Sequence, residues 1–182
     1  KNVFVMDLDL QFGDIGMLFS IDPKDTIVEI VRDLEGISIE KINNYSTIHT
    51  SGATVLCAPK SPEFAEYVTA EHIGKIIENV RPYFEYILID VGASYSDAAV
   101  TAFENSDTIF MINNPDMLSL RGAKIAKNVL NSLVSYDKTE FVLNKFSNGL
   151  IKVKDFENML EKKVYATIAT DYKICQNSIN SG

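Results

Sequence analysis

Short apolar runs alternate with segments of helical periodicity along the chain, and this alternation limits the fold more than any other feature. The runs are nearly continuous, whereas a strand with one face in water alternates apolar and polar residues. Continuous runs of this kind predict strands that are buried on both faces. We expect six of them, at Val3–Asp7, Thr54–Ala58, Tyr86–Asp90, Thr108–Ile112, Phe141–Asn144 and Val164–Ile168.

Helical patterns separate these runs. Apolar residues recur there at three- and four-residue spacing, and Ser, Thr or Asp stands before several patterns as a candidate N-cap. We expect Asp25 to cap Thr26–Leu34, Thr69 to cap Ala70–Val80, Ser96 to cap Asp97–Glu104, and further helices over Met117–Val134 and Lys152–Lys162. The alternation predicts an α/β fold with a doubly wound, mostly parallel sheet of about six strands. Since no linker or repeat is visible, we interpret residues 1–182 as a single domain.

Composition narrows the function classes. The chain carries 17 basic and 25 acidic side chains, a net charge of −8. This disfavours nonspecific nucleic-acid binding, which depends on neutralising phosphates. The apolar runs are far shorter than the ~20 residues that span a bilayer, and no secretory signal is visible. Cys57 and Cys175 are isolated, and His49 and His72 lack metal-ligand spacing, so we expect a cytoplasmic protein without a Cys/His metal centre.

Polar side chains end three of the predicted strands. Asp7 and Asp9 follow the first, Asp90 ends the third, and Asn144 ends the fifth. Ligands of parallel α/β sheets bind beyond the carboxyl ends of the strands. Two carboxylates there can share a hydrated Mg²⁺, and an Asn amide can hydrogen-bond a base. Each residue alone is more typical of a cap or turn, so the prediction depends on their joint order.

The loop that usually binds nucleotide phosphates does not occur in this chain. No Gly-x-x-x-x-Gly-Lys-[Ser/Thr] motif is found, and Gly74-Lys75 lies in a helical pattern before Ile76. No Ser-His-Asp set or G-x-G-x-x-G motif suggests a small-molecule α/β enzyme either.

Several longer motifs occur in collinear order over essentially the whole chain: Asp7-Leu-Asp9-Leu-Gln-Phe-Gly-Asp14, Ala58-Pro-Lys-Ser-Pro-Glu63, Val68-Thr-Ala-Glu-His72, Asn114-Pro-Asp116 with Leu120-Arg121, Val142-Leu-Asn144-Lys145 and Thr170-Asp171-Tyr172. In these motifs the chain resembles the MinD/ParA group of deviant Walker ATPases. It is most similar to the CpaE/TadZ branch, which is associated with the assembly of Flp-type (Tad) pili.

The resemblance implies roles for five residues. Asp9 is similar to the catalytic switch I aspartate, which positions the attacking water, and Asp7 to its companion at the strand end. Asp90 resembles the Walker B aspartate, which holds Mg²⁺ through water. Asn144 resembles the residue that reads adenine, and Asp171 lies in a second loop beside the base. Arg121 is by default a solvated helix charge.

Three departures from the family pattern stand out. The segment that begins at Asp90 reads Asp-Val-Gly-Ala-Ser instead of Asp-x-Pro-Pro-Gly, and Ala169 replaces a common proline. The strand, phosphate loop and helix that precede position 1 in relatives are missing, and the chain looks cut at Gly182 as well. Because that strand lies beside the Walker B strand in relatives, its removal would leave unpaired backbone along Tyr86–Asp90. We therefore expect either that the missing segment is physically present or that the gap is filled by a strand of a neighbouring molecule or by local rearrangement.

The resemblance implies an ATP-binding localisation switch of pilus assembly that uses ATP and Mg²⁺, with weak hydrolysis in the intact protein and none in this chain alone. We expect the protein to form a homodimer and to bind pilus or secretion assembly proteins. We expect it in the cytoplasm, at a cell pole or at the inner face of the membrane. Peripheral membrane association is compatible with this but is not encoded in the segment. The alternative is a degenerate, non-catalytic scaffold with the same fold. A ParA-type partition ATPase is a weaker third hypothesis, because it conflicts with the acidic charge.

Overall fold

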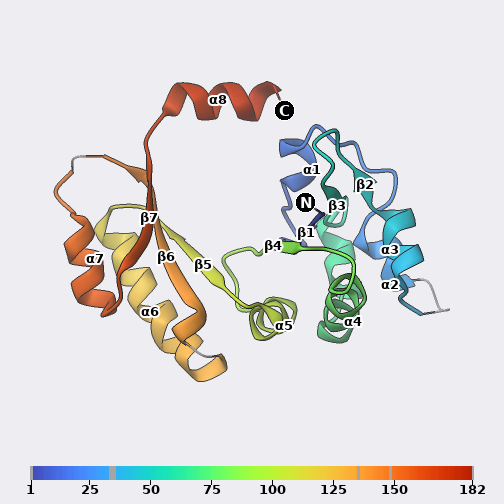
Figure 1. The fold of residues 1–182 in the computed structure, drawn as a ribbon, viewed down its shortest axis with the longest axis horizontal. Coiled ribbons are helices and arrows are strands. Elements are labelled where there is room, and N and C mark those ends of the chain that lie inside the picture. The colour runs from blue at the N-terminus through green and yellow to red at the C-terminus, as the bar shows by residue number, and fades with distance from the viewer. Residues whose placement is uncertain (1, 33–35, 135, 148, 182) are drawn as a thin grey trace. The chain divides into compact units, whose positions relative to one another are not determined.

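A computed structural model describes residues 2–32, 36–134, 136–147 and 149–181, and Figure 1 traces the fold. The chain divides into two compact units. The first comprises Lys1–Asn105 together with Ser178–Gly182, and the second comprises Ser106–Asn177. Each unit is a small sheet with helices packed against it. The single domain expected over 1–182 stays a prediction.

The first unit contains a four-stranded sheet in the order β2-β3-β1-β4. The strand β1 (Val3–Asp7) is parallel to both of its neighbours, β3 (Thr54–Leu56) and β4 (Tyr86–Asp90), and β2 (Thr47–Ile48) runs antiparallel to β3. Residues 4–7 of β1 are buried, as expected of a central strand. The register pairs Asp7 with Asp90, so β1 and β4 end side by side.

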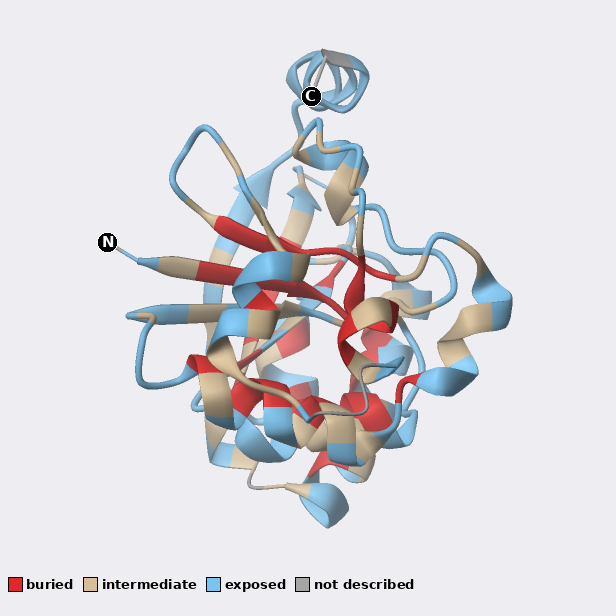
Figure 2. Cartoon of the chain, turned by 90° about the vertical axis from the view of Figure 1, so that its right-hand side faces the viewer, coloured by how far each residue is buried: buried red, intermediate tan, exposed pale blue. Residues whose placement is uncertain are grey.

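Most helices of the first unit lie on one face of this sheet. They are α2 (Ile27–Arg32), α3 (Ile39–Tyr45), a 3₁₀ helix (Pro62–Tyr67), α4 (Ala70–Val80) and α5 (Asp97–Asn105). Their apolar stripes meet Phe4 and Met6 of β1 in the larger core, and Figure 2 shows the buried residues on the strands and on the inward sides of the helices. The four-residue helix α1 (Ile15–Leu18) covers the opposite face, where Ile15 packs against Val5 and Cys57.

Helix starts follow local side-chain chemistry. Thr69 caps α4, because its Oγ1 accepts the His72 N–H while His72 Nδ1 accepts the Thr69 N–H at 3.2 Å. Ser96 accepts the N–H of Ala99 at the start of α5, as predicted. The expected Asp25 cap of α2 is wrong. The helix begins at Ile27, so Thr26 stands at the capping position and its Oγ1 accepts the Val28 N–H at 3.2 Å. Leu34, the predicted end of this helix, lies outside the described residues.

The second unit contains a parallel three-stranded sheet in the order β5-β6-β7. Its strands are β5 (Ile109–Asn113), β6 (Thr139–Phe146) and β7 (Val164–Ala169), and β6 is central. The helices α6 (Met117–Leu133) and α7 (Val153–Leu160) pack against Phe141 and Leu143 of β6, with Phe156 of α7 fully buried. A 3₁₀ turn (Tyr136–Lys138) precedes β6, and α8 (Tyr172–Ser181) follows β7.

The predicted α/β fold with a mostly parallel sheet is confirmed. All six expected strands are present, and β1 and β4 have the predicted ends. The strand β3 ends two residues early, β5 is shifted by one residue, β7 ends one residue late, and β6 is longer at both ends. The structure adds β2, α1, α3 and α8, which sequence patterns did not define. None of the described helices combines the length and the apolar character needed to cross a membrane.

One edge of each sheet is an apolar strand. Within the described residues β4 pairs only with β1, and β5 pairs only with β6. In this part of the chain β1 is thus the strand neighbour of Tyr86–Asp90, and the expected filling of the other side stays a prediction. Leu88 of β4 is 55% exposed, and Phe110 and Ile112 of β5 are 51% and 56% exposed. Neither strand contains a Lys, a Pro or a bulge, the features that protect natural sheet edges.

Candidate functional site

Three carboxylates meet at one edge of the sheet in the first unit. Asp7 and Asp90 end the paired strands β1 and β4. The N–H of Leu8 donates to the carbonyl oxygen of Asp90 at 2.7 Å, so the chain leaving β1 stays beside the end of β4. Asp9 follows one residue later. The structure thus brings together three of the five predicted site residues.

Asp7 is almost fully buried, at 1% exposure. Its Oδ1 accepts the N–H of Asp9 and its Oδ2 accepts the N–H of Ile15, both at 3.1 Å. Burial nevertheless dominates, because it disfavours the charged form, and the pKa of Asp7 is raised to about 6. Its charge is thus held by two backbone donors inside the protein rather than by water.

Asp9 lies between two loops. Its Oδ1 accepts the N–H of Phe12 at 3.2 Å, which folds the chain after β1 back toward the strand end. The backbone of Gly92, in the loop after β4, approaches the same side chain. A Cβ atom at position 92 would lie 3.0 Å from Asp9 Oδ2, so any larger residue there would press against the Asp9 carboxylate.

Negative charge accumulates around Asp90. Its pKa is raised by partial burial and by the negative charges of Asp9 and Asp14. Sequence reasoning missed Asp14 as part of this group, although it ends the same Asp-rich motif. Repulsion among carboxylates of this kind is relieved by a divalent cation, and oxygen ligands suit Mg²⁺. In the described part of the chain, no three His, Cys, Asp or Glu side chains are arranged to bind a metal ion directly.

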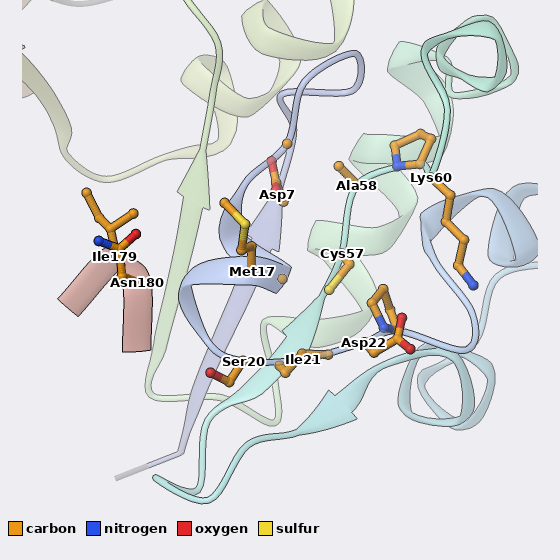
Figure 3. Close-up of a pocket in the computed structure, with 14 residues that line it drawn as sticks. Asp7, Met17, Ser20, Ile21, Asp22, Cys57, Ala58, Lys60, Ile179 and Asn180 are labelled. Atoms are coloured by element: carbon orange, nitrogen blue, oxygen red, sulfur yellow. The ribbon is translucent and has the colours of Figure 1, made fainter. Parts of the chain in front are cut away.

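A cavity of about 780 Å³ adjoins this edge of the first unit (Figure 3). Asp7, Gly13 and Met17 line it from the β1 and α1 side, and Cys57 and Lys60 line it from the end of β3 and the chain that follows. Burial raises the pKa of the Cys57 thiol to about 11, so this cysteine is an unreactive wall residue. The cavity was not predicted from the sequence, because it depends on how α1 folds over the sheet.

The second unit holds the remaining two predicted site residues. Asn144 is half-buried in β6, and its Oδ1 accepts the N–H of Lys145 at 2.9 Å. Asp171 follows β7, and its Oδ1 accepts the N–H of Ile174 at the start of α8. The N–H of Thr170 donates to the carbonyl of Phe146, joining the ends of the two strands. Because β6 and β7 are parallel, Asn144 and Asp171 lie at the same edge of this sheet.

The two histidines and Arg121 make structural contacts or face solvent. His72 serves the α4 cap, and His49 hydrogen-bonds Ser51 and packs edge-on against Phe19. Arg121 is exposed on α6, which agrees with a solvated helix charge.

Comparison with known proteins places the fold. No protein-family model matches the sequence. A ParA family ATPase from Chlorobium tepidum superposes with a TM-score of 0.91 at 20% identity, covering 99% of this chain and 75% of that one. The fold is that of the MinD/ParA ATPases. The septum site-determining protein MinD of Pyrococcus horikoshii, solved with Mg-ADP, gives a TM-score of 0.79 at 16% identity over 98% of this chain and 73% of its own.

Among curated proteins, an uncharacterized ATP-binding protein of Methanocaldococcus jannaschii is 22% identical over 176 residues, 96% of this chain. The chain spans 65% of the length of that relative. The fold thus supports the resemblance to the MinD/ParA group. The narrower resemblance to the CpaE/TadZ branch stays a prediction.

Proposed function

We propose that this chain forms the core of an ATP-dependent localisation switch of the MinD/ParA type. The observation that carries the proposal is the convergence of Asp9 and Asp90 beside the buried Asp7 at the carboxyl edge of the first sheet. Ligands of doubly wound sheets bind at that edge. The fold supports it, as do the relatives described as an ATP-binding protein and as MinD complexed with Mg-ADP.

In this proposal Asp9 and Asp90 divide the work at the phosphate end. Bound Mg²⁺ would offset the charge of the transferring phosphoryl group. Asp90 is the exposed carboxylate at the end of β4 and would hold a water of the hydrated ion. Asp9 is fixed by the Phe12 N–H and by the approach of Gly92, so its carboxylate is oriented before substrate arrives. It would accept a hydrogen bond from the attacking water and orient it.

The base would lie at the edge of the second sheet. Asn144 offers an amide that can donate to and accept from adenine. Asp171 would flank the base from the neighbouring loop. Both residues stand at the ends of adjacent parallel strands, which supports a common ligand for them.

For the biological role we propose assembly of Flp-type (Tad) pili, with the protein acting as a homodimer that recruits assembly proteins. The support is the collinear set of motifs that resembles the CpaE/TadZ branch. A solved MinC:MinD complex of Aquifex aeolicus, which has a TM-score of 0.80 to this chain, indicates that the fold suits partner binding.

A second candidate is a non-catalytic localisation module with the same fold. The segment after Asp90 favours it, because Val91-Gly-Ala-Ser94 lacks the paired prolines and the glycine position of the usual switch. If this segment does not respond to the γ-phosphate, the protein would bind nucleotide only as a structural ligand or would not bind it at all.

The deciding experiment compares three variants of the full-length protein, using a fluorescent ATP analogue for binding and phosphate release for turnover. Asp9→Ala should lower kcat at least ~100-fold with ATP affinity within about threefold, because Asp9 acts on water rather than on the ground state. Asn144→Ala should weaken affinity at least ~10-fold. Arg121→Ala, on the exposed side of α6, is the control and should change neither. Equal loss of affinity and rate in Asp9→Ala contradicts the assigned role, and ATP binding without turnover in the wild type favours the module.

A further inference from the structure

The carboxylate of Asp7 is buried, and both of its oxygens accept backbone N–H groups, although the residue also forms part of the wall of the adjacent cavity. Its side chain is 1% exposed, and each of its oxygens accepts one backbone N–H. A carboxylate that binds a hydrated metal ion or a nucleotide must present an oxygen to the solvent-filled site. Asp7 therefore differs from Asp9 and Asp90, whose side chains reach the surface.

The two donors mark the ends of one loop. The N–H of Asp9 begins it, and the N–H of Ile15 ends it, since Ile15 is the first residue of α1. The preceding residue, Asp14, makes no capping hydrogen bond with its own side chain. Asp7 thus supplies, from the end of β1, an acceptor for the first of the N–H groups that a helix start leaves without an intrahelical partner.

The middle of the loop is packed against the same carboxylate. A Cβ atom on Gly13 would lie 2.5 Å from Asp7 Oδ2 and would overlap the Cβ of Ala58. The loop can close around Asp7 only because position 13 is glycine. Asp7 therefore contacts the loop at its two ends and at its centre.

We propose that Asp7 is a positioning residue that holds the 9–15 loop, and through it the Asp9 carboxylate, instead of ligating metal or nucleotide. The catalytic role of Asp9 rests on the proposed function. The hydrogen bonds by which Asp7 fixes the 9–15 loop do not depend on it. Since α1 begins at Ile15 and its Gly16 and Met17 line the adjacent cavity, Asp7 also links that cavity wall to Asp9.

The first test is amide hydrogen exchange by NMR on the 182-residue chain. Asp7→Ala removes both acceptors, so exchange at the Asp9 and Ile15 amides should accelerate about tenfold or more. Asp7→Asn keeps one acceptor oxygen and turns an NH₂ donor toward the other N–H, so only one of the two amides should lose protection. Asp14→Asn is the matched control: it removes one negative charge from the same loop and should leave both amides within about twofold of wild type. Unchanged exchange in Asp7→Ala overturns the proposal.

The second test requires no variant to fold. In the labelled wild-type chain, scalar couplings across hydrogen bonds should connect the Ile15 and Asp9 amide nitrogens to the Asp7 carboxyl carbon. Their absence when the loop amides are sharp and protected overturns the proposal.

The third test separates positioning from ligation in the full-length protein. Asp7→Asn should leave the Mg²⁺ and ATP affinities within about threefold while kcat falls at least ~10-fold. A fall in Mg²⁺ affinity as large as that of Asp90→Ala overturns the proposal. A wild-type protein that binds no nucleotide refutes the proposed function instead, and the exchange and coupling measurements still decide whether Asp7 holds the loop.

Discussion

The buried carboxylate of Asp7 should make the first unit less stable as pH rises toward neutrality. Its pKa is raised from 3.8 to about 6 because burial penalises the charged form more than the two backbone donors favour it. A folded-state pKa above the unfolded value means that folding is favoured when the group is protonated. The stability contributed by this group is therefore fully present below pH ~4 and is lost as pH rises through about 6.

The magnitude follows from the size of the shift. A raise from 3.8 to about 6 corresponds to about 3 kcal/mol at ~1.36 kcal/mol per pKa unit. Linkage places about 2 kcal/mol of this between pH 4 and pH 7. Asp90 has a raised pKa as well and acts in the same direction, so the effect of Asp7 must be isolated by difference. Asp7→Asn provides the reference, because it retains the shape without the ionisation.

The assay is urea denaturation of wild type and Asp7→Asn at several pH values, with a ¹³C NMR titration of the aspartate carboxyl carbons. The stability of wild type relative to Asp7→Asn should fall by about 2 kcal/mol from pH 4 to pH 7. The Asp7 carboxyl should titrate near 6. A difference that is flat with pH, or an Asp7 resonance that titrates below 4, refutes the reasoning. Such a result would mean that the backbone donors outweigh desolvation.

Three further predictions concern the chain itself. Gly13→Ala should lower the free energy of unfolding by at least ~2 kcal/mol in thermal or urea denaturation. Gly122→Ala, in a helix with open space around it, should raise the free energy of unfolding by about 0.5–1 kcal/mol. Equal effects of the two substitutions would contradict the crowding around Gly13. The 182-residue chain should release no phosphate from ATP above a blank without protein, since it contains no phosphate-binding loop motif; release that Asp9→Ala abolishes would disprove this. Leu88→Lys and Ile112→Lys, each on an apolar sheet edge, should lower the average mass in sedimentation, and a wild-type chain that is already monomeric at high concentration would count against association through these edges.

The sequence predicted the strands well where burial dictates composition. Val3–Asp7 and Tyr86–Asp90 were defined to the residue because a continuous apolar run followed by Asp has few other interpretations. The helix α1 could not be predicted, since four residues carry no periodicity and the acceptor for its first N–H comes from Asp7, eight residues earlier. The choice between Asp25 and Thr26 as a cap depended on a one-residue boundary, which patterns do not resolve.

The candidate site was predictable in membership but not in geometry. Strand ends identified Asp7, Asp9 and Asp90, because parallel strands present their carboxyl ends at one edge. The burial of Asp7 and the negative charge that Asp14 adds near Asp90 depend on how the loop after β1 closes. The loop can close in this way because Gly13 has no side chain to collide with Asp7 and Ala58. A motif gives the spacing of residues along the chain, whereas their division into buried and exposed carboxylates follows only from the folded loop.

The two apolar edges bear on the proposed function as directly as the carboxylates do. Natural sheets protect an edge with charge, proline or a bulge, and in β4 and β5 the one such feature is Asp90 at the last position of β4. Both are instead composed like central strands, with Leu88 and Phe110 more than half exposed. Strands of this composition are stable in water when a further strand pairs with them, supplied by the same protein or by another molecule. Asp90 lies at the carboxyl end of such an edge, so a strand that pairs with β4 in the parallel direction would end beside Asp90 and bring the chain that follows it to the acidic site.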